Sequence, residues 1–246
     1  MNVFSQIGIY LGLVYKAFGR PEKRSVYWKQ VLREIDVLGV DSLGITIIIS
    51  VFMGAVIAIQ TGTDITNPLI PKYLVGYTTK QSMILEFSPT ILSLILAGKV
   101  GSRIASEIGT MRVTEQIDAL EIMGVNSASY LILPKIIASL LINPILVIVS
   151  MFVGICGGWA ASVLTGLVTS NDFSTGLYYS WRPFFISYAM IKTVIFAFLI
   201  STISSYYGYY TSGGALEVGR ASTKAVVMSS IFILIFNFVL TQLLLI

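Results

Sequence analysis

Charged residues are so unevenly spaced in this sequence that long stretches contain none. Asp41 and Asp64 enclose one such stretch, Ser42–Thr63, which contains the run LGITIIISVFMGAVIAIQ. A helix of about 20 apolar residues crosses the hydrocarbon core of a bilayer. Only 11% of the residues are charged, against about 25% in soluble domains, and 55% are hydrophobic. Such a surface must face lipid, so the sequence predicts an all-α integral membrane protein.

Four more spans are predicted from the same pattern, which gives five transmembrane helices in total. They cover about Met83–Ile108, Ile136–Leu164, Phe184–Tyr206 and Val226–Ile246. An interfacial piece should follow the third span, because the uncharged stretch there is longer than one untilted helix needs. The second span carries Glu86 near its start, and Lys192 interrupts the fourth.

Residues 1–40 are predicted to form interfacial N-terminal helices ahead of the five-span region at 41–246, within a single domain covering 1–246. Ile7, Leu11, Val14 and Phe18 recur near helical spacing. Trp28 follows among basic residues, a pattern typical of helices at the headgroup level of a membrane. A small soluble extension is the alternative.

The distribution of lysine and arginine predicts an N-in, C-out orientation. Five spans place the termini on opposite sides, and cytoplasmic loops carry the excess of basic residues. With the N-terminus inside, twelve basic residues fall on the cytoplasmic side: Lys16, Arg20, Lys23, Arg24, Lys29, Arg33, Lys99, Arg103, Arg112, Lys135, Arg220 and Lys224. Only Lys72, Lys80, Arg182 and Lys192 remain outside or in the outer half.

Small residues recur every fourth position along two predicted spans, where they let helix backbones approach closely in lipid. The two rows are Ser50, Gly54, Ala58 and Gly62, and Ala97, Gly101, Ala105 and Gly109. Gly154 and Gly158 form a further pair of this kind. Close packing within one subunit is the favoured interpretation, and a subunit interface is the alternative.

Lys99, Arg103 and Glu107 follow the same four-residue step, so all three point the same way from the inner part of the second span. Ionisable groups at membrane depth usually face a cavity, a partner or the headgroups. A lipid headgroup site is one interpretation of this stripe, and an end-of-helix cluster that reaches the interface is the other. The same two interpretations apply to Lys192.

Residues Arg112–Met123 (RVTEQIDALEIM) predict one short amphipathic helix in a cytoplasmic loop between spans two and three. Val113, Ile117 and Leu120 fall on one face, and Glu115, Asp118 and Glu121 point away from it. Such a helix suits a groove on a soluble partner. Three acidic residues make a position on anionic headgroups less favourable.

Residues that carry catalytic chemistry are scarce. The chain contains no histidine and one cysteine, Cys156, so the commonest metal ligand and general base are absent. The Gly98–Lys99 pair is followed by valine and is preceded by Ser93 where a phosphate-binding loop needs glycine. We therefore predict no catalytic residue, no metal and no cofactor in this chain, and expect ATP, if it is used, to bind another chain.

Three stretches resemble a known family. They are GKVGSRIASEIGTMRVTEQIDALEIMGV from Gly98, IKTVIFA from Ile191, and GYYTSGGALEVGRASTKAVV from Gly208. Together they resemble the MlaE/YrbE permeases, the membrane subunits of ABC transporters that work with MCE lipid-transfer proteins.

That resemblance implies a homodimer with an N-terminal interfacial helix and five spans per subunit. It implies that Glu115–Leu120 is the coupling helix, which docks on a cytoplasmic ABC ATPase that binds ATP and Mg²⁺. The two subunits would enclose a lipid pocket open to a periplasmic MCE partner, with Arg103 and Glu107 near its base.

The implied function is ATP-driven movement of phospholipids or related lipids between inner and outer membranes, which maintains outer-membrane lipid asymmetry. The location would be the inner membrane of a Gram-negative-type bacterium, and no nucleic acid is expected as a partner. The alternatives are a membrane-embedded lipid-modifying enzyme that uses Glu107 as acid and base, and a channel.

Overall fold

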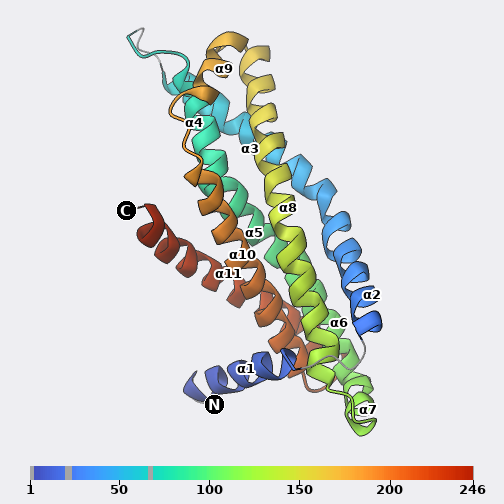
Figure 1. Cartoon of the computed structure of the whole chain (residues 1–246). Coiled ribbons are helices and arrows are strands. Elements are labelled where there is room, and N and C mark those ends of the chain that lie inside the picture. The colour runs from blue at the N-terminus through green and yellow to red at the C-terminus, as the bar shows by residue number, and fades with distance from the viewer. Residues whose placement is uncertain (1–2, 20–23, 66–68, 246) are drawn as a thin grey trace. The chain divides into compact units, whose positions relative to one another are not determined.

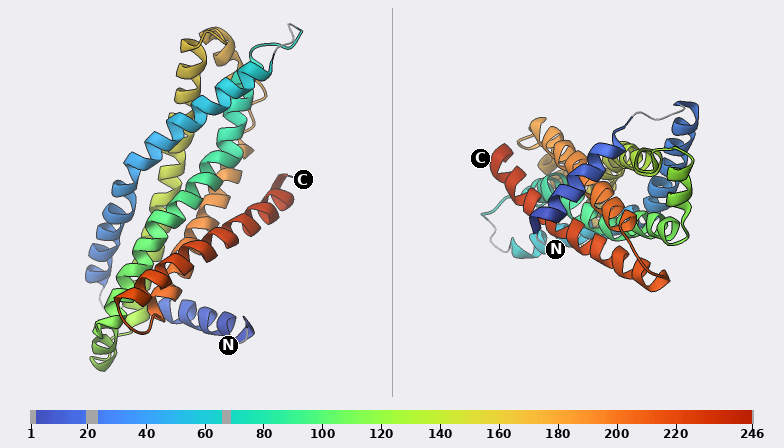
Figure 2. Two further views of the ribbon diagram at one scale, coloured as in Figure 1. Left: turned by 180° about the vertical axis from the view of Figure 1, so that it is seen from behind. Right: turned by 90° about the horizontal axis from the view of Figure 1, so that it is seen from below.

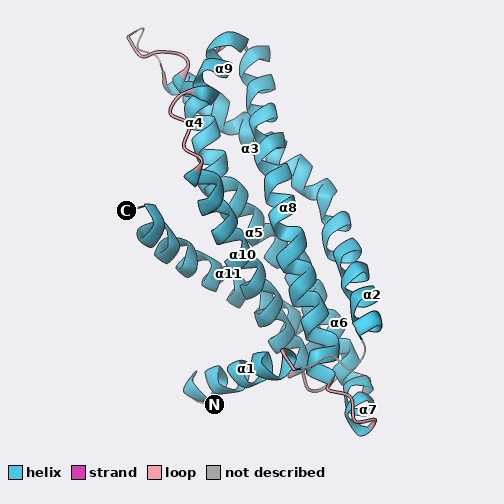
Figure 3. Ribbon diagram, viewed as in Figure 1, coloured by secondary structure: helices cyan, strands magenta, loops and turns pink. Residues whose placement is uncertain are grey.

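The structure, a computed structural model, describes residues 3–19, 24–65 and 69–245, and every regular element within these ranges is helical (Figures 1 and 3). The α-helices are α1 (Val3–Ala17), α2 (Arg24–Ile35), α3 (Asp41–Asp64), α4 (Leu74–Ser82), α5 (Leu92–Leu96), α6 (Ser102–Val113), α7 (Gln116–Ile122), α8 (Ser127–Leu164), α9 (Ser170–Tyr178), α10 (Phe184–Tyr209) and α11 (Ala215–Leu245). Three π-helical segments, η1 (Asp36–Val40), η2 (Met83–Ile91) and η3 (Ala97–Gly101), join some of them end to end.

Five continuous helices among the described residues are long and apolar enough to cross a membrane, which confirms the predicted number. They cover Tyr27–Asp64, Leu74–Val113, Ser127–Leu164, Phe184–Tyr209 and Ala215–Leu245. Several are longer than the charge-free stretches that predicted them, because charged residues at their ends continue the helix. The short helix α9 follows the third span, and the interfacial position predicted for the stretch after that span stays a prediction.

The helices of the N-terminal region differ from the predicted ones. α1 is a separate helix, whereas α2 runs through η1 directly into α3. The chain around Trp28 therefore belongs to the same continuous helix as the first span. The predicted interfacial position of residues 1–40 stays a prediction.

Wider π-helical turns occur where the sequence disturbs regular helix geometry. η2 contains Pro89, which lacks a backbone N–H and whose ring would clash with a carbonyl one turn earlier in an α-helix. A π-helical turn accommodates such a disturbance without ending the helix. The second span thus stays continuous from Leu74 to Val113.

The chain forms two compact units. Unit 1 contains Met1–Asp41, Leu94–Asn143 and Val194–Ile246, and unit 2 contains Ser42–Ser93 and Pro144–Thr193. Each unit is assembled from segments far apart in the sequence, and several long helices continue from one unit into the other.

In unit 2, α3 and α8 approach so closely that their glycines touch backbone to backbone. A Cβ atom added to Gly54 would lie 1.8 Å from the carbonyl oxygen of Gly154, and one added to Gly157 would lie 2.5 Å from that of Val51. Ser50 donates to Ser150 at 2.7 Å, and Ser150 donates to Ser88 at 3.1 Å. The first small-residue row therefore packs within the chain.

In unit 1, α6 packs against α10 and α11. A Cβ atom on Gly208 of α10 would lie 2.7 Å from the carbonyl oxygen of Ala105, and Ser222 of α11 donates to the carbonyl of Ser102 at 3.2 Å. The second small-residue row also packs within the chain. α1 crosses α10, as the right-hand view in Figure 2 shows, and the Tyr10 hydroxyl lies 2.7 Å from that of Thr202.

Candidate functional site

The charged stripe on η3 and α6 faces the chain's own acidic groups. The Lys99 ammonium donates to the backbone carbonyl of Asp41, and the Arg103 guanidinium pairs with the Asp41 carboxylate at 3.1 Å. Asp41 lies where η1 continues into α3, within the continuous helix of the first span.

Glu107, the third residue of the stripe, belongs to a second ion-pair cluster centred on Lys135. The Lys135 ammonium lies 2.8 Å from Glu107 and 2.7 Å from Glu34 of α2, and its side chain is only 3% exposed. A cation this deeply buried needs paired acceptors, because the cost of removing it from water is several kcal/mol. Three segments of unit 1 therefore meet through one buried lysine.

These partners explain the charged stripe without a bound lipid. All three side chains already have partners of opposite charge or polarity in the protein, so no bound phosphate is needed to explain their presence at membrane depth. Arg103 and Glu107 remain about half exposed, at 46% and 45% of their side-chain surface. The predicted lipid-pocket role of Lys99, Arg103 and Glu107 stays a prediction, without the charge argument that first suggested it.

Lys192 belongs to unit 2, whereas the stripe belongs to unit 1. Its ammonium is completely buried, pairs with Glu86 at 2.8 Å, and lies 4.5 Å from the centre of the Tyr188 ring. Glu86 also accepts a hydrogen bond from Thr90 at 3.1 Å. Sequence reasoning singled out both charges but did not pair them, since they come from different spans.

The expectation of one continuous helix over Arg112–Met123 is wrong. α6 ends at Val113, Glu115 adopts a left-handed conformation with φ 60°, and α7 begins at Gln116. Arg112 pairs with Asp118 across this break. The break changes which residues share a face, because helical periodicity does not continue through it.

The exposed apolar surface of α7 is at its C-terminal end. Ile117, predicted to face a partner, is completely buried within the chain, and Val113 and Leu120 are half-buried. Ile122 and Met123 are 87% and 68% exposed. A partner that docks here would meet Ile122 and Met123 first.

Glu121 fixes α7 to two other helices. Its carboxylate accepts hydrogen bonds from the Tyr209 hydroxyl at the end of α10 and from the Ser127 hydroxyl at the start of α8, both at 2.9 Å. These bonds, the Tyr209 bond foremost, hold the pKa of Glu121 below its usual range. The prediction that Glu121 points away from the apolar face left this anchoring role undetected, since Tyr209 is far away in the sequence.

No group of three or more metal-ligating side chains occurs among the described residues. The candidate site is thus a set of ion pairs and an exposed helix end.

Comparison with known proteins identifies the family. The sequence profile described as Permease MlaE matches residues 31–243. The chain belongs to the MlaE permease family.

Named relatives of this MlaE-family permease agree with the profile. A probable ABC transporter permease protein of Rickettsia bellii is 37% identical over 89% of this chain and 84% of the relative. The intermembrane phospholipid transport system permease protein MlaE of Haemophilus influenzae is 31% identical over 91% of this chain and 85% of the relative. Protein TRIGALACTOSYLDIACYLGLYCEROL 1, chloroplastic, of Arabidopsis thaliana is 36% identical over 89% of this chain and 63% of the relative.

This MlaE-family chain is therefore an ABC transporter permease and a multi-pass membrane protein. It is a transporter subunit, and the enzyme alternative raised by Glu107 is not supported.

Proposed function

We propose that this chain is the permease of an ATP-driven transporter that moves phospholipids between the inner and outer membranes of a Gram-negative-type bacterium. The match of the MlaE profile across residues 31–243 carries the proposal. The Haemophilus relative, whose name specifies intermembrane phospholipid transport, supports the choice of cargo. Maintenance of outer-membrane lipid asymmetry is the physiological role that follows.

The proposed assembly contains two copies of this chain, a cytoplasmic ABC ATPase and a periplasmic MCE-domain protein. ATP and Mg²⁺ bind the ATPase, because this sequence has no phosphate-binding loop. The excess of basic residues at the predicted inner ends of the spans supports an N-in, C-out orientation. In that orientation α7 lies in the cytoplasm and docks on the ATPase.

The structure suggests how docking at α7 would reach the membrane spans. Ile122 and Met123 are exposed at the helix end, where they would fill an apolar groove on the ATPase. Glu121 connects α7 to α10 and α8 through two hydrogen bonds to its carboxylate. Movement of the ATPase would thus pull directly on two long helices.

Copurification tests the proposal. Affinity-tagged chain expressed in its own bacterium should carry an ATPase and an MCE-domain protein, and mass spectrometry should find bound phospholipid. The purified complex should transfer labelled phospholipid between vesicles only when ATP is hydrolysed. Transfer that proceeds without ATP would instead favour the channel alternative.

A further inference from the structure

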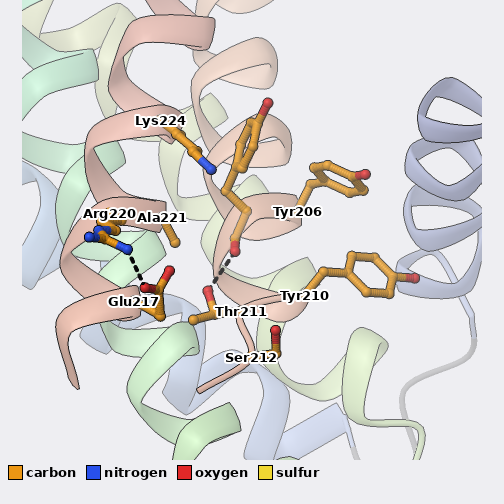
Figure 4. A pocket seen from close by; sticks show the side chains of 9 residues that line it. Tyr206, Tyr210, Thr211, Ser212, Glu217, Arg220, Ala221 and Lys224 are labelled. Carbon is orange, nitrogen blue, oxygen red and sulfur yellow. Dashed lines mark hydrogen bonds and ion pairs between the residues drawn. The ribbon is translucent and has the colours of Figure 1, made fainter. Parts of the chain in front are cut away.

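A polar pocket of about 240 Å³ lies in unit 1 between the end of α10 and the start of α11 (Figure 4). Arg220 and Lys224 project from α11 on one side, and Tyr206 and Tyr210 lie on the other. The pocket thus combines two cations with aromatic side chains. None of its residues belongs to the charged stripe of η3 and α6.

The pocket carries one more positive than negative charge. Arg220 pairs with Glu217 at 2.6 Å, and both side chains line the pocket. Lys224 is exposed and makes no hydrogen bond or ion pair with any residue that the structure describes. The hydroxyl of Ser212, in the loop that joins the two helices, adds a hydrogen-bonding group. This lining suits an anionic group that carries a single charge.

Two consecutive tyrosines connect the pocket to α7. Tyr210, which lines the pocket, packs against Tyr209 with 5.3 Å between the ring centres. The Tyr209 hydroxyl donates to the carboxylate of Glu121 on α7 at 2.9 Å. The pocket and α7 therefore lie close together within unit 1.

The charge distribution along α11 places the pocket at the end of the fifth span. No charged residue follows Lys224 in the sequence. The uncharged stretch that begins at Ala225 is long enough to cross the hydrocarbon core, which takes about 20 residues. Lys224 therefore lies where the span leaves that core. In the proposed N-in orientation this end is cytoplasmic, as is α7.

We propose that the pocket binds an aspartate or glutamate side chain of the cytoplasmic ATPase, as a contact separate from the docking of α7. The inference rests on the proposed function, since it needs an ATPase on this side of the membrane. One carboxylate balances the excess positive charge of the pocket. Lys224 and Arg220 can donate charge-assisted hydrogen bonds to its oxygens.

The two contacts differ in charge, and this difference orients the ATPase. Glu115 and Asp118 make the N-terminal end of α7 acidic, whereas Arg220 and Lys224 make the pocket cationic. Complementary charges fix the register of an interface and disfavour wrong arrangements. The ATPase surface should therefore be basic opposite the start of α7 and acidic opposite the pocket.

Zero-length cross-linking tests the proposal directly. The full-length chain is purified in complex with the ATPase of its own bacterium and treated with a carbodiimide, which joins a lysine to a carboxylate in direct contact. Mass spectrometry of the digested complex should find Lys224 linked to an aspartate or glutamate of the ATPase. Lys72, an exposed lysine that the charge distribution places outside, should give no such link.

Variants at the pocket measure what the contact contributes. Lys224→Gln should remove the cross-link and weaken ATPase binding about tenfold, as expected for the loss of a charge-assisted hydrogen bond. Lys29→Gln, at an exposed position of α2, is the matched control and should bind like the wild type. Lys224→Glu should bind still more weakly, and replacement of the cross-linked acidic residue of the ATPase by lysine should restore its binding. Unchanged thermal unfolding midpoints would show that each variant is folded.

Retained binding would overturn the proposal. Wild-type affinity of Lys224→Gln for the ATPase, or a Lys224 linked only to carboxylates of this chain, would show that no ATPase side chain occupies the pocket, and would leave the proposed function intact. Loss of bound anionic lipid without loss of the ATPase from Lys224→Gln would show that a headgroup occupies the pocket instead. A wild-type chain that binds no ATPase would overturn the proposed function and this contact together.

Discussion

Single buried charges hold unit 1 together, and Lys135 is the clearest case. Its ammonium is shared by Glu34 and Glu107, and it is almost fully buried. Within the part of the chain that the structure describes, one carboxylate oxygen of Glu34 is buried without a hydrogen-bond partner, so Glu34 depends strongly on this lysine. A buried ion pair adds little net stability when intact, but its breakage leaves an uncompensated charge.

Lys135→Met should therefore lower the free energy of unfolding by about 3–5 kcal/mol. Loss of the cation leaves Glu34 and Glu107 facing one another without compensation. Thermal unfolding in detergent measures the effect, with Lys29→Met at an exposed position as control. A Lys135→Met chain as stable as the control would show that the two carboxylates find other partners.

Glu121 gives a pH-dependent prediction. Because its folded-state pKa is lowered, its stabilising bonds to Tyr209 and Ser127 are fully present above the ordinary glutamate pKa of about 4.3 and are lost as the pH falls through the lower folded value. Amide hydrogen exchange in α7 should accelerate over that acidic window. Glu121→Gln should show fast exchange at neutral pH with little further change, and Tyr209→Phe should lie between the two.

At this scale the sequence identified the charged residues but not their partners. Four-residue spacing placed Lys99, Arg103 and Glu107 on one helix face, which needs only local geometry. Their partners Asp41 and Lys135 come from other helices, and no pattern along the chain encodes such contacts. Because the sequence does not show these partners, it suggests a lipid headgroup as the partner of the stripe.

At the scale of elements, glycine rows set the distance between helices. Gly54→Ala should destabilise the protein by about 1–3 kcal/mol, since the new methyl group would collide with the backbone of Gly154. Gly44→Ala lies on the same helix with open space around it and should be neutral or slightly stabilising. Equal unfolding midpoints for the two variants would mean that α3 and α8 can separate at little cost.

Because the helix breaks at Glu115, Ile117 is buried within the chain, whereas Ile122 and Met123 are exposed and form the proposed docking surface. Ile122→Asp and Met123→Asp should weaken binding of the partner ATPase about tenfold or more, because each replaces an exposed apolar contact with a charge. Ile117→Asp should instead unfold α7, because that side chain is buried within the chain. Pull-down measures binding, and expression level reports folding. Normal ATPase binding by both the Ile122→Asp and the Met123→Asp variant would show that the ATPase docks on another surface.

Element types were predictable where periodicity is long and uninterrupted. The five spans follow from long apolar stretches, although charged residues occur within the second and the fourth. The break between α6 and α7 was not predicted, because Thr114 and Glu115 carry no glycine or proline signal and a left-handed glutamate is uncommon. The sequence pattern does not predict the continuity of α2 with α3 for a related reason, since charged residues interrupt the apolar stretch although the helix continues through them.

At the scale of the whole molecule, the proposed N-in, C-out orientation rests on the charge distribution alone. Arginine and lysine are retained on the cytoplasmic side during insertion, and twelve of the sixteen fall there if the N-terminus is inside. Single cysteines at Ser5, Ser170, Ser212 and Ile246 in a Cys156→Ser background test this orientation with an impermeant thiol reagent added from outside. Only Ser170→Cys and Ile246→Cys should react in intact cells, and all four should react after permeabilisation. Because Ser212 and Ser170 lie on opposite sides of the span at Phe184–Tyr209, labelling of Ser212→Cys from outside would contradict the five-span arrangement and with it the cytoplasmic position of α7.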